Sequence, residues 1–61
     1  MTNIIEESLM TTAEVAAHLA VPESFVRRLV RERRIEFVKV GRYVRFESTA
    51  LYLFVERARR S

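Results

Sequence analysis

The chain has 61 residues, of which 49% are hydrophobic and 31% are charged, and it contains no cysteine. We expect one small domain, whose core has neither a disulfide nor a thiolate metal site to stabilise it. The hydrophobic fraction argues against a disordered segment, and no apolar run approaches the roughly 18 residues of a membrane span. Glu6 and Glu7 stand where a secretory signal carries Lys or Arg. We therefore expect a cytoplasmic protein with no membrane partner.

The kinds of charged residue favour binding over catalysis. All eight acidic residues are Glu, and the chain has one His, one Gly and one Lys. Catalytic triads, paired carboxylates, His-rich metal sites and glycine-rich phosphate loops need residues that these counts barely supply. We therefore expect no enzyme, no metal site and no cofactor. The other ten basic residues are Arg, whose planar guanidinium suits phosphates and base edges.

The net charge of +3 is unevenly distributed along the chain. Residues 1–21 contain three Glu and no Lys or Arg, hence −3, whereas residues 22–61 contain eleven basic residues and five Glu, hence +6. Residues 1–8 are acidic and lack periodicity, which predicts a tail before a single domain over residues 9–61. Scattered Arg residues are by default a solvated surface, so their placement on each element decides whether they form a binding surface.

The first predicted helix begins at Thr11 and runs to Leu19. Thr11 and Glu14 have the spacing of a capping box, and Met10 with Val15 has that of a hydrophobic staple. A helix of about two turns is therefore expected here.

A second helix is predicted from Glu23 to about Arg33, after a tight turn. Pro22 favours the start of a helix and disfavours helical backbone in the residue before it. Apolar residues recur with helical period at Phe25, Val26, Leu29 and Val30. The opposite face, at i, i+3, i+4 and i+7, carries Ser24, Arg27, Arg28 and Arg31.

The period then changes from helical to alternating, and β-branched and aromatic residues dominate through Phe46. Two strands are predicted, over residues 37–40 and 43–46, joined at Gly41 and Arg42. Gly41 supplies the positive φ that such a turn requires. The candidate binding residues of this hairpin are Lys39, Arg42, Tyr43 and Arg45.

A last helix is predicted from about Thr49 to Arg59, because Ser and Thr residues precede a further apolar stripe. Tyr52 and Leu53 lie outside that stripe. They are a candidate contact between protomers, and the alternative is that they pack against the N-terminal tail.

The order of these elements is that of a winged helix-turn-helix domain, an α+β fold that is mainly helical, with three helices and a two-stranded wing. Such a second helix enters the DNA major groove, and the wing reaches the backbone or the minor groove. Ser24 and Arg27 are the better candidates for base edges, whereas Arg28 and Arg31 could contact a phosphate equally well. Glu23 either stabilises the helix dipole or accepts a hydrogen bond from cytosine.

The stretch from Leu9 to Phe54 resembles the excisionase family of small winged-helix proteins, which is related to the DNA-binding head of MerR-type regulators. The most specific matching block is residues 37–46, Phe-Val-Lys-Val-Gly-Arg-Tyr-Val-Arg-Phe. The other matching residues are Leu9-Met10-Thr11, Glu14-Val15-Ala16, Leu19-Ala20-Val21, Val26, Arg28-Leu29-Val30, Ala50-Leu51 and Phe54. Three positions depart from the family pattern: Pro22 replaces a common Ser cap, and Ala20 and Arg33 replace glycines.

The resemblance implies DNA contacts by Arg27, Arg28, Lys39 and Arg42. It also implies a recombination directionality factor of a phage or mobile element, which acts in the bacterial host cell. Such a protein does no chemistry: it binds cooperatively beside neighbouring copies near the attachment site, bends DNA and promotes excision by the integrase. The alternative is a small phage-type transcriptional regulator on the same fold. A third hypothesis, an antitoxin-like protein interaction module, predicts little affinity for DNA.

Overall fold

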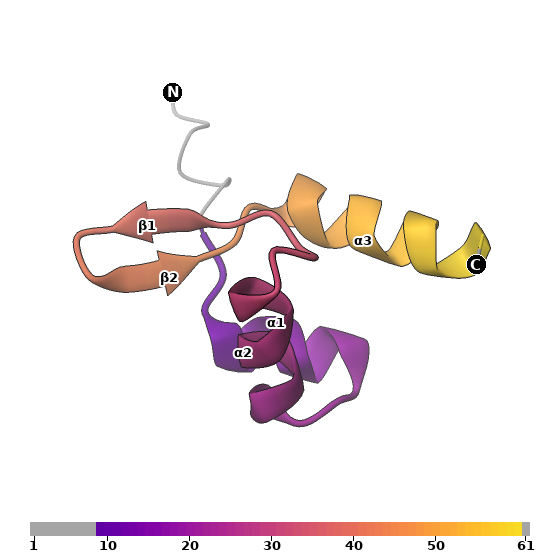
Figure 1. Cartoon of the computed structure of the whole chain (residues 1–61), viewed down its shortest axis with the longest axis horizontal. Coiled ribbons are helices and arrows are strands. Elements are labelled where there is room, and N and C mark those ends of the chain that lie inside the picture. Colours follow the sequence, from indigo (N-terminus) through magenta and orange to yellow (C-terminus); the bar gives the residue numbers. More distant parts are fainter. Residues whose placement is uncertain (1–8, 61) are drawn as a thin grey trace.

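The computed structural model describes residues 9–60, and the predicted tail of residues 1–8 lies outside them. The elements follow in the order α1 (Thr12–Leu19), α2 (Glu23–Arg31), β1 (Val38–Val40), β2 (Tyr43–Arg45) and α3 (Ser48–Arg60). Figure 1 shows α1 and α2 together in one layer, with the hairpin and α3 extending to opposite sides of the molecule. The fold is therefore the predicted one, three helices with an antiparallel two-stranded wing.

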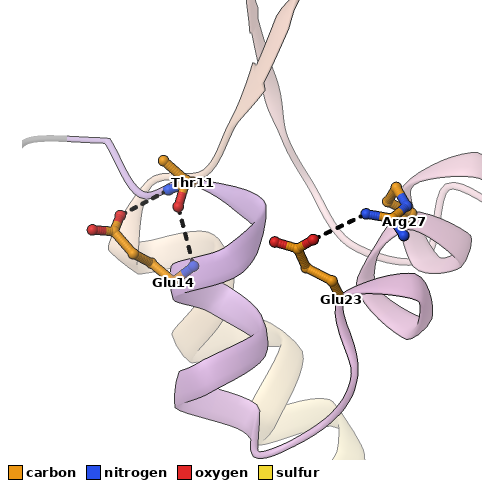
Figure 2. A network of polar contacts seen from close by, with 4 residues as sticks. All are labelled: Thr11, Glu14, Glu23 and Arg27. Atoms are coloured by element: carbon orange, nitrogen blue, oxygen red, sulfur yellow. Dashed lines mark hydrogen bonds and ion pairs between the residues drawn. The ribbon is translucent and has the colours of Figure 1, made fainter.

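The start of α1 confirms the predicted capping box (Figure 2). The Thr11 hydroxyl accepts a hydrogen bond of 3.1 Å from the backbone N–H of Glu14. The Glu14 carboxylate accepts one of 2.9 Å from the backbone N–H of Thr11. The two side chains thus satisfy two donors that a helix start would otherwise leave unpaired, which fixes where α1 begins.

The turn between α1 and α2 is closed by a Schellman motif at Ala20, whose backbone is left-handed with φ 59°. The N–H of Ala20 donates to the Ala17 carbonyl at 3.2 Å, and the N–H of Val21 donates to the Ala16 carbonyl at 3.1 Å. Pro22 then occupies the N-cap of α2 instead of its first turn, and it has no side-chain cap bond. Ala20 thus adopts the left-handed backbone conformation that a glycine adopts at lower cost.

Helix α2 ends at Arg31, two residues earlier than the sequence predicts. A second Schellman motif ends it, in which Arg33 is left-handed with φ 58°. The N–H of Arg33 donates to the Val30 carbonyl at 3.0 Å, and that of Arg34 donates to the Leu29 carbonyl at 2.8 Å. The last apolar residue of the helical stripe is Val30, and no glycine or proline follows it before Gly41, so the sequence does not mark this end of the helix.

The wing pairs Val38 with Arg45, Lys39 with Val44 and Val40 with Tyr43. Gly41 has φ 66° in the connecting turn, as predicted. Both strands are one residue shorter than expected, because residues 37 and 46 lie outside the ladder. Phe46 instead forms an antiparallel bridge with Met10. The base of the wing is thereby attached to the segment that caps α1.

The core lies between α1, α2 and the base of the wing. Its buried residues are Val15, Ala16, Val26, Leu29, Ile35 and Phe46. Helix α3 contributes one buried residue, Ala50, together with the half-buried Leu51 and Phe54. Ala58, near the end of α3, is exposed, because the later turns of this helix extend away from α1 and α2 (Figure 1).

Candidate nucleic-acid interface

Helix α2 presents its polar face to solvent, as its periodicity predicts. Ser24, Arg27, Arg28 and Arg31 are all exposed. One of them has an acidic partner on the same helix: Arg27 Nη1 lies 3.1 Å from the Glu23 carboxylate, one turn earlier (Figure 2). Both side chains of this pair are largely solvent-exposed, so it orients Arg27 and contributes little to stability.

A groove separates α2 from the wing. One part of it has a volume of about 320 Å³ and is lined by Thr12, Arg27, Val30, Arg31 and Val44. The adjoining part, of about 460 Å³, is lined by Val30, Arg31, Arg33, Phe37, Lys39 and Val44. Because three residues line both parts, we treat them as one surface and call it the α2–wing groove. Four cations therefore surround a partly apolar floor.

The register of the wing determines which of its side chains reach this groove. Lys39 and Val44 are directly paired, so they lie on the same face of the ladder, and both line the groove. Tyr43 and Arg45 lie on the opposite face. The four predicted binding residues of the wing thus divide between two surfaces.

The outer face of the wing carries a cluster of two guanidiniums around one aromatic ring. The Arg42 guanidinium lies over the Tyr43 ring at 5.4 Å from its centre, and that of Arg45 lies at 5.3 Å. Arg45 also donates a hydrogen bond of 2.8 Å to the Val44 carbonyl. Stacking on a ring leaves the in-plane N–H groups of a guanidinium able to donate to a phosphate. Tyr43 is therefore a platform for two cations and is itself exposed.

The predicted residues of α2 are divided in a similar way. Arg27 and Arg31 line the α2–wing groove. Arg28 stacks over the Phe25 ring at 5.7 Å instead, and neither it nor Ser24 lines the groove. The polar face of α2 thus divides into two sets of side chains. Arg27 and Arg31 lie toward the wing, and Ser24 and Arg28 are directed outward.

Sequence reasoning missed Arg33 as a candidate site residue, and it missed the apolar floor formed by Val30 and Val44. Arg33 lies beyond the predicted basic stripe of α2, and only the reversal of the chain at that residue brings it into the groove. The sequence did contain one indication that Arg33 is unusual, because this arginine stands just after a helix, at a position that favours glycine. The valines carried no such signal, because they belong to ordinary apolar patterns.

The described part of the chain offers no metal centre. Within residues 9–60, no three His, Cys, Asp or Glu side chains are placed to hold an ion, and no polar or charged side chain is buried. His18 is exposed on α1. None of the helices in this range is long and apolar enough to cross a membrane.

Comparison with known proteins agrees with this geometry. The model of a family described as a helix-turn-helix domain matches residues 9–59, which include both helices, the wing and most of α3. No curated protein and no solved structure matches the chain at a significant level. The exposed basic helix, the wing beside it and this match together show that the chain belongs to the helix-turn-helix domain family, a class of DNA-binding domain.

Proposed function

We propose that this protein binds double-stranded DNA sequence-specifically, without catalysing a reaction, as an excisionase of a phage or mobile element in its bacterial host. The observation that carries the DNA-binding part is the α2–wing groove, which four cations surround: Arg27, Arg31, Arg33 and Lys39. A groove with this charge between a helix and a wing suits the phosphate strand that separates a major groove from the next minor groove.

The exposed face of α2 provides the base-reading element. The major groove of B-DNA is about 12 Å wide and admits one helix. With α2 in it, the outward-directed Ser24 and Arg28 would face base edges. Arg27 and Arg31 would remain at the side of the wing, where the phosphates pass. We therefore propose base contacts for Ser24 and Arg28 and phosphate contacts for Arg27 and Arg31, which exchanges the roles that the sequence favours for Arg27 and Arg28.

The tip of the wing provides a second contact with the backbone. Arg42 and Arg45 are both oriented by the Tyr43 ring on the face opposite Lys39. We propose that these three residues contact the phosphates or the edge of the adjacent minor groove. Together with α2, the wing would span one half-turn of the duplex.

The excisionase role is supported by the size of the interface and by α3. A single small domain contacts few base pairs, so useful specificity requires neighbouring copies on the DNA. Tyr52 and Leu53 are 62% and 44% exposed on α3. We propose that they contact the next copy, and that the resulting row of protomers bends the attachment site for the integrase. A small transcriptional regulator remains the second candidate.

DNA binding is tested by its dependence on salt. Phosphate contacts by several cations make affinity fall steeply with ionic strength, and the slope decreases by about 0.9 for each contact removed. Arg27→Gln and Arg42→Gln should each lower both the affinity and the slope. Arg59→Gln is the matched control, because Arg59 lies on the last turn of α3 and is paired with Glu56. A flat salt response of the unchanged protein would instead favour the protein interaction module.

The biological role is tested by recombination in vitro. Excision by the cognate integrase should be stimulated by the protein, and Arg27→Gln should abolish the stimulation. DNA binding without stimulation, accompanied by altered transcription from a nearby promoter, would favour the regulator.

A further inference from the structure

A further hollow adjoins the α2–wing groove on the side of α3. It has a volume of about 560 Å³, and its polar lining consists of four cations and one carboxylate: Arg33, Arg34, Lys39, Arg57 and Glu36. We call it the loop–α3 hollow, because the α2–β1 connection forms most of it. Arg33, Phe37 and Lys39 line both this hollow and the groove, so the basic surface continues from α2 to α3.

Arg33 stands at the junction of the two hollows, in a conformation that arginine disfavours. Its φ of 58° is left-handed, a region that glycine enters freely and other L-residues avoid. The helix-ending bonds at this position use only backbone atoms, so a glycine would form them equally well. The side chain therefore contributes nothing to ending α2. Residues held in disfavoured conformations are concentrated at ligand sites, where the side chain has a use.

The contacts of Arg33 leave its donors available. Its guanidinium lies over the Phe37 ring, 5.6 Å from the ring centre. This stacking uses the face of the guanidinium, while its N–H groups lie in the plane and can donate to phosphate oxygens. Phe37 is half-buried and packs against the core, so it supports the stack from a fixed position. Arg33 is thus held at the boundary between the groove and the loop–α3 hollow.

We propose that the loop–α3 hollow binds a phosphate of the DNA backbone, with Arg33 as its central ligand. The phosphate belongs to the duplex that α2 enters, so this inference rests on the proposed DNA binding. It extends the contact beyond α2 and the wing to the connection between them. The four cations of the lining outnumber the nearby carboxylates, which are Glu36 in the lining and Glu32, 3.6 Å from Arg34, so the local potential is positive.

The test uses a duplex of random sequence, because phosphate contacts do not depend on sequence. Fluorescence anisotropy over a range of salt concentrations gives the affinity and its salt slope. Arg33→Gly should weaken binding about tenfold, the loss of one charged hydrogen-bonded contact. It should also reduce the salt slope by about 0.9. Arg33→Lys keeps the charge and should retain the slope of the unchanged protein.

Ala20→Gly is the matched control for Arg33→Gly. Both substitutions place glycine at a left-handed residue that closes a Schellman motif, but Ala20 lines neither the α2–wing groove nor the loop–α3 hollow. Neither variant should unfold more easily than the unchanged protein, and Ala20→Gly should bind DNA normally. Glu36→Gln should bind more tightly than the unchanged protein, which a purely structural role of the hollow would not produce.

The outcomes separate this inference from the function it depends on. If Arg33→Gly binds with unchanged affinity and slope, the loop–α3 site is wrong while DNA binding stands. Equal losses in Arg33→Gly and Ala20→Gly would also overturn it, because they would show an effect of the turn and not of the charge. Failure of the unchanged protein to bind any duplex would overturn both proposals.

Discussion

Met10 and Phe46 exchange two backbone hydrogen bonds, one of 2.8 Å from the Met10 N–H and one of 2.9 Å from the Phe46 N–H. This short bridge joins the end of β2 to the residue immediately before the capping box of α1. Phe46 also places its ring in the core, where the side chain is fully buried. Phe46 therefore attaches the base of the wing both to the start of α1, through its backbone, and to the core, through its side chain.

Phe46→Ala should cost about 3 to 5 kcal/mol of unfolding free energy, because it empties a fully buried ring position. That loss is comparable with the total stability of a small domain, roughly 5 kcal/mol, so the variant should be largely unfolded. Circular dichroism during urea unfolding measures the effect. Phe46→Leu is the milder comparison, because it keeps most of the apolar volume. A folded Phe46→Ala protein of normal stability would contradict the role assigned to this residue.

Glu23→Gln should increase the affinity for random-sequence DNA while changing stability by less than about 0.5 kcal/mol. The exposed pair with Arg27 is worth little to folding. The Glu23 carboxylate, however, competes with DNA phosphates for the Arg27 guanidinium. Its negative charge also repels the DNA backbone. Anisotropy titrations of both proteins at one salt concentration measure the change. A weaker variant would indicate instead that Glu23 accepts a hydrogen bond from DNA.

Gly41→Ala should destabilise the protein by about 1 to 2 kcal/mol, since a residue with a Cβ is strained at φ 66°. No atom within 4 Å would clash with the added methyl group, so the whole cost comes from the backbone. Ala20→Gly should have the opposite sign for the same reason, with a smaller gain because glycine also loses more entropy on folding. Urea unfolding of the two variants compares them directly, and equal signs would contradict the argument.

Leu53→Glu should abolish cooperative binding on DNA with several adjacent sites and leave binding to a single site unchanged. In a contact between two copies, the Glu carboxylate would be buried without a partner. On a single protomer position 53 is exposed, so the same carboxylate stays in water. Electrophoretic mobility shifts on one-site and multi-site duplexes distinguish the two cases. Thr49→Glu is the control, because it adds the same charge at another exposed position of α3. If Leu53→Glu unfolds the protein, Leu53 belongs to the core and the proposed contact is wrong.

Much of the fold could be predicted because its signals are local. The capping box of Thr11 and Glu14 and the positive φ of Gly41 each depend on a few neighbouring residues, and both are confirmed. The ends of elements were predicted less well. No glycine or proline follows the apolar stripe of α2 to mark where the helix ends, and the alternation of the strands includes Phe46. Such patterns describe which residues prefer to be buried, whereas the chain reversal and the bridge to Met10 decide where an element stops.

The sequence by itself determined that this protein has a basic second helix followed by a basic hairpin, because charge and hydrophobic periodicity depend only on the order of residues along the chain. Only the tertiary structure decided which of those cations act together. Arg31 and Lys39 line one groove because the fold places the wing beside α2, while Arg42 and Arg45 share a ring on its outer face. The left-handed turn at Arg33 brings this residue into the same surface. Such groupings arise from contacts between elements, which no local pattern contains.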